Sequence, residues 1–307
     1  MKNHCAIQSP LNYTGGKFRL LPQILPLLPK DIGTFVDLFC GGCNVGININ
    51  CNMVIFNDIN SKLINLLNTF KHQEKSEIIS SIYKIIRDEN LSLVSEHSYE
   101  FYKCNSSKGL AEYNKEQYLK LREKFNRATT YDFEYFITLY VLIIYAFNNQ
   151  IRFNRKGEFN LPIGKRDFNN TIKNKLEKFI DKIHSTNCEF VSYDFDNFDI
   201  DHLTNQDFVY ADPPYLICCA AYNENGGWTA QNEIALLSLL DELDKRQVRF
   251  ALSNVLTNKG IDNIYIKKWL ENNPHYKCNH LTFSYSNSNY QVKDRLSKTD
   301  EVLITNY

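Results

Sequence analysis

The sequence has no net charge, no long apolar run and no regular cysteine pattern, and each absence excludes a class of protein. Lys and Arg together number 35, and Asp and Glu together also number 35, so the formal net charge is zero. That balance excludes a globally basic protein of the histone kind, although a local basic cluster can still bind nucleic acid. No stretch approaches the roughly 20 continuous apolar residues of a membrane span, and the first residues do not resemble a signal peptide. We therefore expect a cytoplasmic protein with no membrane attachment.

The nine cysteines are odd in number and scattered along the chain. Cys40 and Cys43 have the spacing of a zinc or redox pair, but neither a second pair nor a histidine follows at ligand spacing. Free thiols in a reducing compartment are the expected state. We predict no metal site.

Two glycine-rich phosphate signatures are also missing. The absence of Gly-x-Gly-x-x-Gly argues against a nicotinamide enzyme, and the turn at Gly15–Lys17 is too short for a Walker loop. A second glycine turn begins at Gly41, directly after the strand-like run 35–38, where it would let a ligand approach the backbone. Another apolar run ends just before Asp58, the position at which such folds hold ribose hydroxyls. This combination predicts a cofactor that contains a nucleoside.

The 307 residues suffice for one large α/β domain or for a domain with a sizeable insertion. Strand-like runs stand near both ends of the chain, whereas the middle shows only helical apolar spacing until about residue 183. We therefore predict a catalytic domain made of 1–60 and 184–307, interrupted by an inserted subdomain at 61–183. The runs that predict strands are 35–38, 53–56, 189–193, 208–210, 248–254 and 301–306. Those that predict helices are 20–29, 61–70, 77–86, 118–126, 133–147, 171–183 and 233–243, and 284–290 predicts a loop.

The chemistry is expected at Asp212-Pro213-Pro214-Tyr215, which follows the apolar run 208–210. Two prolines cannot continue a central strand, because proline has no N–H and a fixed φ. The result is a stiff turn that presents a carboxylate and an aromatic ring at the carboxyl end of a strand, where open α/β sheets bind ligands. The alternative is an ordinary turn in which Asp212 merely caps the next segment.

The segment 151–166 differs from its helical surroundings. Its apolar and polar residues alternate, and Lys156-Gly157 predicts a hairpin turn. The segment carries five cations and a single acid, Glu158. Cations interleaved with Phe, Asn and Pro suit phosphate contacts and base-edge contacts in DNA. The alternative is a solvated hairpin. A further acid and aromatic pair, Asp194-Phe195, follows the run 189–193 and could clasp a flat heterocycle.

Taken in order, these motifs resemble the Dam-type, alpha-group adenine-specific DNA methyltransferases. The matching segments are Tyr13–Lys17, Phe39–Gly46, Asn57–Asn60 and Asp212–Tyr215, with the insertion between the third and the fourth. The resemblance implies an α/β fold: a Rossmann-like, S-adenosylmethionine-dependent methyltransferase sheet with an inserted, mainly helical DNA-recognition subdomain that carries a β-hairpin.

The resemblance also implies residue roles. Catalysis falls to Asp212, Pro213, Pro214 and Tyr215. The cofactor, S-adenosylmethionine, would contact Tyr13, Lys17, Asp37, Gly41, Asp58, Asp194, Phe195 and Asp212. Relatives usually have Glu at Asp37, Pro at Leu38 and a differently spaced second glycine. The expected DNA contacts are Asn148, Gln150, Arg152, Asn154, Arg155, Lys156, Pro162 and Arg166, with Arg152 and Arg166 as candidates for guanine.

The implied reaction is methyl transfer to N6 of an adenine flipped out of duplex DNA, within GATC or another site that contains GAT. Asp212 and the Pro213 carbonyl would accept the two amine N–H bonds while Tyr215 stacks on the base. Double-stranded DNA is then the partner, and a restriction endonuclease that cuts the same site is a functional counterpart. Two alternatives stay open: an amino methyltransferase of RNA or protein, and a degenerate module that only binds DNA.

Overall fold

The structure is a computed structural model that describes residues 6–13, 15–221, 227–282 and 299–307. It divides into two units, which are described separately below. The helical unit comprises Met1–Gly16, Gly41–Ile47 and Asn60–Phe190, and the sheet unit comprises Lys17–Cys40, Asn48–Ile59 and Val191–Tyr307. The predicted boundaries at 60 and 183 remain a proposal. The predicted loop at 284–290 lies outside the described residues.

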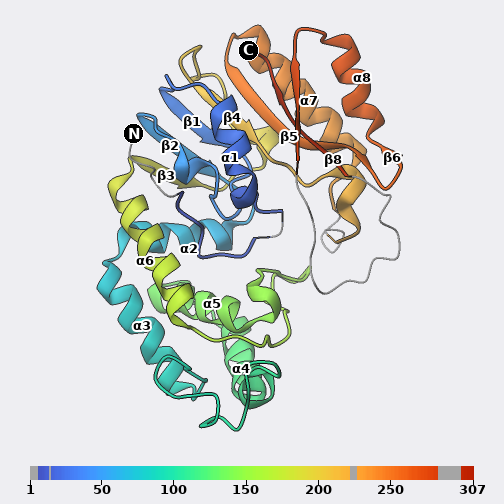
Figure 1. The fold of residues 1–307 in the computed structure, drawn as a ribbon. Helices are drawn as coiled ribbons and strands as arrows, with labels where there is room; N and C mark the ends of the chain where they lie inside the picture. The colour runs from blue at the N-terminus through green and yellow to red at the C-terminus, as the bar shows by residue number, and fades with distance from the viewer. Residues whose placement is uncertain (1–5, 14, 222–226, 283–298) are drawn as a thin grey trace. The chain divides into compact units, whose positions relative to one another are not determined.

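The described residues form a mixed sheet of eight strands (Figure 1), of which all but most of β3 belong to the sheet unit. The strand order is β3-β2-β1-β4-β5-β8-β7, and β6 pairs with β5 off this path. β2, β1, β4 and β5 run parallel, whereas β8 is antiparallel to both of its neighbours, β5 and β7. The strands are β1 (Thr34–Asp37), β2 (Met53–Asn57), β3 (Cys188–Val191), β4 (Phe208–Ala211), β5 (Arg249–Asn258), β6 (Ile261–Asp262), β7 (Lys277–Leu281) and β8 (Asp300–Thr305). This mixed α/β architecture fits a methyltransferase fold.

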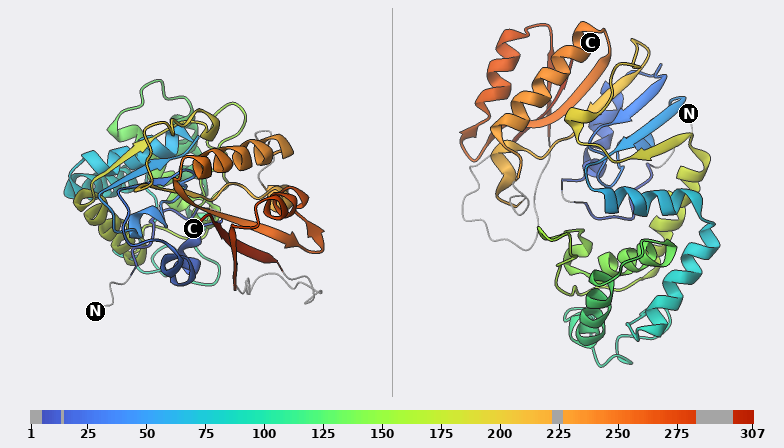
Figure 2. Two further views of the ribbon diagram at one scale, coloured as in Figure 1. Left: turned by 90° about the horizontal axis from the view of Figure 1, so that it is seen from above. Right: turned by 180° about the vertical axis from the view of Figure 1, so that it is seen from behind.

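The central strands are buried on both faces, as expected for parallel strands covered by helices. Val36, Val209 and Phe250 are neighbours in register and pack in one apolar core with side chains of α7 (Ala230–Lys245) and α8 (Ile264–Asn272). The alternate residues Phe35 and Phe208 stack on the opposite face, with ring centroids 5.5 Å apart. The left view of Figure 2 shows α7 and α1 (Leu21–Ile24) on opposite sides of the sheet.

The strand directions decide which residues share an edge of the sheet. The parallel strands β1, β2, β4 and β5 all end at one edge, and β8 begins there because it runs the other way. Residues that follow the parallel strands therefore meet the first residues of β8. The carboxyl edge of a parallel sheet is where open α/β folds bind ligands.

The helical unit is built around α5 (Phe133–Tyr145), whose side chains are buried almost without exception (Figure 1). α5 contacts three helices that precede it, each of which turns an apolar stripe toward it. These are α2 (Ser61–His72), α3 (Lys75–Asp88) and α4 (Ala111–Asn126), and the unit also contains α6 (Asn170–Ser185).

The predicted strands and helices are confirmed, with shifts at their ends. The segment 20–29 is broken by its prolines into the 3-10 turns Lys17–Leu20 and Leu25–Leu27 on either side of α1. β6, β7 and α8 were not predicted. The segment 151–166 contains no strand. The chain reverses at Gly157, the isolated bridge Phe153↔Phe159 joins its arms, and Ile163 bridges to Ala146 outside the segment. The regular hairpin therefore stays a prediction.

Within the ranges that the structure describes, no helix combines the length and the apolar character needed to cross a membrane.

Candidate active site

Carboxylates stand at or just beyond the ends of four strands of the sheet. Asp37 is the last residue of β1, Asp58 comes directly after β2, and Asp212 comes directly after β4. Asp194 stands three residues beyond β3 and begins the 3-10 turn Phe195–Asn197. Asp37 and Asp58 are buried, with 2% and 7% of their surface exposed. Buried carboxylates at a ligand-binding edge are groups for which a cationic or hydroxyl-bearing ligand would be a partner.

Asn57 fixes the spacing of the loops that carry these acids. Its side-chain nitrogen donates to the carbonyls of Leu38, at 3.0 Å, and Tyr193, at 3.1 Å. Its side-chain oxygen accepts from the Tyr193 amide at 2.9 Å. One amide side chain therefore ties together the ends of β1, β2 and β3, which is a contact that the sequence did not reveal.

Asp212 lies at the centre of a buried polar cluster. Lys17 Nζ is 2.9 Å from Asp212 Oδ1 and 3.6 Å from Glu301 Oε1. The Tyr215 hydroxyl donates to Asp212 Oδ1 at 2.9 Å and is 3.4 Å from Glu301 Oε1. The ammonium also lies over the Tyr215 ring, 4.9 Å from its centroid. The structure thus brings Lys17, Asp212 and Tyr215 together and adds Glu301, while their roles in catalysis and cofactor binding stay predictions.

The surroundings of Asp212 shift its protonation equilibrium. Burial raises the pKa of the Asp212 carboxyl, Lys17 and Tyr215 act in the opposite direction, and the charge of Glu301 raises it again. Burial, followed by the charges of Asp212 and Glu301, raises the pKa of Tyr215 well above its ordinary value. The tyrosine therefore keeps its proton and acts as a donor, while the aspartate is an acceptor of high basicity.

Asp194 and Phe195 have structural partners of their own. The Asp194 carboxylate accepts from the Asp196 amide and so caps the turn that it begins. The Phe195 ring is buried against the rings of Phe39 and Trp228, whose centroids lie 5.5 Å and 5.4 Å from its own. Phe195 is therefore first of all a core residue, and its assignment to the cofactor remains a prediction.

Tyr13 and Gly41 belong to the helical unit and meet there. Gly41 has φ +45°, in the left-handed region that favours glycine. A Cβ atom at this position would lie 2.8 Å from Cδ1 of the Tyr13 ring. Asn44 supports the same turn, because its side-chain oxygen accepts from the Ser9 amide at 3.0 Å. Glycine is therefore required at position 41 both by the backbone and by the ring packed on it.

The predicted DNA contacts also lie in the helical unit and differ in how far they are engaged. The Asn154 side chain accepts from the amides of Lys156 and Glu158 and donates to the Glu158 carboxylate, so it builds the turn. Arg152 Nε donates to Asn160 across the two arms at 2.9 Å. The remaining predicted contacts are exposed or half-buried: Asn148, Gln150, Arg155, Lys156, Pro162 and Arg166.

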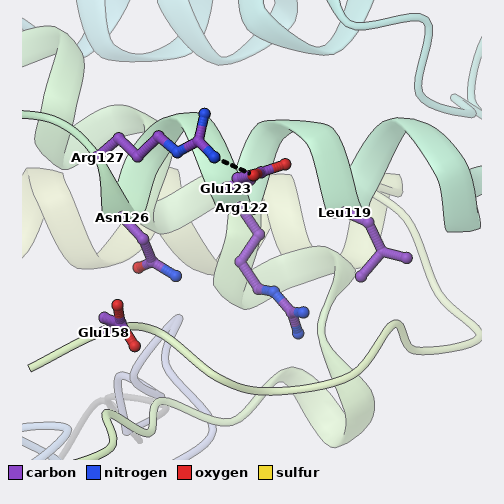
Figure 3. Close-up of a pocket in the computed structure, with 6 residues that line it drawn as sticks. All are labelled: Leu119, Arg122, Glu123, Asn126, Arg127 and Glu158. Atoms are coloured by element: carbon purple, nitrogen blue, oxygen red, sulfur yellow. Dashed lines mark hydrogen bonds and ion pairs between the residues drawn. The ribbon is translucent and has the colours of Figure 1, made fainter. Parts of the chain in front are cut away.

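Side chains of α4 hold the far arm of this segment. Asn126 donates to the Phe159 carbonyl at 3.0 Å and accepts from the Phe159 amide at 2.8 Å, as a neighbouring strand would. Tyr118 and Arg122 both donate to the Leu161 carbonyl. Figure 3 shows Arg122 and Asn126 extending from α4 toward the segment that carries Glu158. They line a polar pocket of about 430 Å³, together with Leu119, Glu123, Arg127 and Glu158.

No group of three or more His, Cys, Asp and Glu side chains with metal-binding geometry occurs in the described part of the chain. The side chains of Cys40 and Cys43 are buried and are not joined in a disulfide.

Sequence reasoning missed two residues that organise the site, Asn57 and Glu301. Glu301 carried a weak signal, because it is one of two acids, with Asp300, directly before the apolar run Val302–Ile304. Glutamate is almost never fully buried unless it is paired. Asn57 carried none beyond its position beside Asp58.

Comparison with known proteins gives a consistent result. A family model described as D12 class N6 adenine-specific DNA methyltransferase matches residues 13–285. Type II methyltransferase M.FokI of Planomicrobium okeanokoites is 41% identical over 312 residues, which cover 100% of this chain and 44% of that protein. Modification methylase StsI of Streptococcus sanguinis is 37% identical and is matched over 98% of this chain and 43% of its own length. The DNA adenine methylase of Escherichia coli K12 is 28% identical over 80% of this chain and 79% of its own length. The chain spans less than half the length of the first two relatives.

Replacing Gly41 tests the turn packed under Tyr13. Gly41→Ala should lower the free energy of unfolding by about 2–5 kcal/mol, because a left-handed backbone and a collision with the ring both cost energy. Gly260→Ala is the matched control: Gly260 has φ +78° with no atom within 4 Å of its added Cβ, so only the backbone cost of about 1–2 kcal/mol applies. Denaturant unfolding of both variants measures the difference. Equal losses in the two variants would show that Tyr13 does not pack on Gly41.

Proposed function

Because the chain belongs to the D12 class of N6 adenine-specific DNA methyltransferases, we propose that it transfers a methyl group from S-adenosylmethionine to N6 of an adenine in duplex DNA. The observation that carries the proposal is the Asp212-Pro213-Pro214-Tyr215 turn at the end of β4. Its carboxylate is paired with Lys17 and its tyrosine is anchored to that carboxylate.

The chemical task explains the turn. The exocyclic amine of adenine is a poor nucleophile, because its lone pair is delocalised into the ring. The Asp212 carboxylate and the Pro213 carbonyl accept hydrogen bonds from the two N–H groups of the amine, so the nitrogen becomes pyramidal. The positive charge that develops on this nitrogen then faces a fixed anion. Preorganised acceptors of this kind stabilise the transition state more than the ground state. The two prolines keep both acceptors on a rigid turn.

Tyr215 holds the target base. Its hydroxyl is bound to Asp212, so the ring is fixed relative to the acceptor that it serves. An aromatic face on a strand-end turn is a stacking platform for a base that has left the duplex. Stacking and hydrogen bonding then orient the amine for in-line attack.

The residues of the chain suit S-adenosylmethionine, which supplies a methyl group on a positively charged sulfur. Asp37 and Asp58 are buried acids at the ends of adjacent strands, suited to the ammonium group and the ribose hydroxyls respectively. Position 41 has no room for a side chain because the Tyr13 ring packs on it, so only glycine can form this turn. Tyr13, Lys17, Asp194 and Phe195 complete the proposed cofactor set.

We further propose that 61–183 is the target-recognition subdomain and that 151–166 is its reading element. Arg152 and Arg166 suit guanine, since a guanidinium matches the O6 and N7 acceptors. Asn148 and Gln150 suit other base edges, and the exposed Arg155 and Lys156 suit phosphates. The proposed target is GATC or another site that contains GAT.

The biological role proposed is protection of DNA within a restriction-modification pair. Two of the relatives are named as modification methylases. The counterpart would be a restriction endonuclease that cuts the same site, and the enzyme would act in the cytoplasm, on cellular DNA.

Methyl transfer from labelled S-adenosylmethionine tests the activity and the role of Asp212 together. The wild-type chain should label duplex DNA that contains GATC, but not RNA or protein. Asp212→Asn should lower the rate by at least about 100-fold, because it removes the anionic acceptor, while DNA affinity stays within a few-fold. Asp199→Asn, which changes an exposed acid in the same unit, is the control and should label normally. Wild-type protein that binds the cofactor but labels no DNA would refute the activity, and an active Asp212→Asn would refute the role.

Asn126→Ala tests whether α4 positions the reading element. The change removes both hydrogen bonds to the backbone of Phe159, so the far arm of 151–166 loses its register. The preference for target over unrelated DNA should fall about 10-fold, the effect of one or two lost hydrogen bonds. Lys120→Ala, on the exposed side of α4, is the control. Competition binding measures the preference. An unchanged preference in Asn126→Ala would show that the far arm takes no part in recognition.

A further inference from the structure

Glu301 reaches the active site because β8 runs against the parallel strands. It is the second residue of β8, where it pairs in register with Val255 of β5 and Leu281 of β7. Only 2% of its surface is exposed, and the next three residues of the strand, Val302–Ile304, are apolar and buried. A buried acid in such a strand costs free energy unless it has a function or a partner.

Two donors stand between two carboxylates. Lys17 Nζ and the Tyr215 hydroxyl are each 2.9 Å from Asp212 Oδ1. The same two atoms lie 3.6 Å and 3.4 Å from Glu301 Oε1. Glu301 is therefore a second acceptor for both donors, at a distance that a small side-chain movement closes.

This arrangement answers a difficulty in the proposed reaction. Asp212 must accept a hydrogen bond from the target amine, and the ammonium and the hydroxyl that already donate to its Oδ1 weaken the whole carboxylate as an acceptor. A donor that left Asp212 without another partner would be a buried polar or charged group with nothing to bind, which is strongly unfavourable. A second carboxylate beside the first removes that penalty.

We propose that Glu301 is a positioning residue that takes over the Tyr215 hydroxyl and shares the Lys17 ammonium when the target amine binds to Asp212. The exchange makes and breaks hydrogen bonds only, and no covalent bond or proton changes hands. In the structure Asp212 is the nearer acceptor of both donors. With the base bound, Glu301 holds them and Asp212 faces the amine. The inference rests on the proposed function.

The electrostatics of the cluster agree with this role. The charge of Glu301 acts to raise the pKa of Asp212, which makes that carboxylate a stronger acceptor. Two other titratable groups face the same cluster. Burial raises the pKa of Tyr210 in β4, and the charges of Asp212, Asp37 and Glu301 raise it further. Burial and the charge of Glu301 raise the pKa of Cys218. Loss of the Glu301 charge should therefore lower the pKa of Asp212 and extend activity to lower pH, while the maximal rate falls.

The test is steady-state kinetics of the full chain with GATC-containing duplex DNA, measured across pH. Glu301→Gln should lower kcat about 10- to 100-fold, because a strong acceptor is lost. The KM for DNA and the KM for S-adenosylmethionine should stay within about 3-fold, since only the exchange of donors is affected. The acid limb of the pH profile should move to lower pH.

Two further variants separate charge from position. Asp300→Asn removes the same charge from the adjacent residue of β8, whose carboxylate pairs with the exposed His280 at 2.7 Å, and should match the wild type. Glu301→Asp keeps the charge but places the carboxylate one methylene group farther from Lys17 and Tyr215. We therefore expect kcat to fall while the acid limb of the pH profile stays in place. Denaturant unfolding of each variant reports any loss of stability.

The outcomes are distinct. Glu301→Gln with wild-type kcat, or with reduced kcat and an unmoved acid limb, overturns the inference and leaves the proposed function standing. If Glu301→Gln does not fold, Glu301→Asp decides: reduced kcat at wild-type stability supports the inference, and wild-type kcat overturns it. A wild-type chain that methylates no DNA refutes the proposed function itself.

Discussion

The ion pair between Lys17 and Asp212 is the interaction on which the site depends. A carboxylate that must be basic enough to receive an amine has to be withdrawn from water, and a withdrawn carboxylate needs a partner. Lys17, itself 4% exposed, supplies that partner from the start of the sheet unit. Tyr215 and Glu301 complete the cluster, in which four side chains from three parts of the chain hold two carboxylates, one ammonium and one hydroxyl together. Strand direction makes this possible, because β4 ends and the antiparallel β8 begins at the same edge.

The two units use different means to hold functional segments. In the sheet unit, backbone pairing places the acids, and one asparagine, Asn57, spaces the loops that follow three strands. In the helical unit, the segment 151–166 has no strands, and side chains of α4 take the place of a ladder. Asn126 pairs with both backbone groups of Phe159, which is how a strand neighbour would satisfy them. The proposed reading element, held by side chains, can change its register with few substitutions, whereas the proposed catalytic turn is fixed by the sheet.

Local chemistry decided what the sequence could reveal. The turn at Asp212 was predictable because two prolines must end a strand, and the helices of the middle region were predictable from their apolar spacing. β7 was not predicted because Lys277–Leu281 is an edge strand of mostly polar residues with little apolar alternation. α8 was not predicted because it is short. The pairing of Lys17 with Asp212 and Glu301 joins residues far apart in the chain, so no local pattern encodes it. Phe195 was assigned to the cofactor from the resemblance, and its burial against Phe39 and Trp228 shows a packing role that the motif could not display.

The central claim is that the Asp212 turn methylates adenine at a defined DNA site. The most direct measurement is to sequence the DNA of cells that express the chain by a method that detects N6-methyladenine, with cells that express Asp212→Ala as the reference. The account predicts methylated adenine at nearly every copy of one short sequence that contains GAT in cells with the wild-type chain, and none above background in the reference. Methylation absent from both, or equal in both, would contradict it.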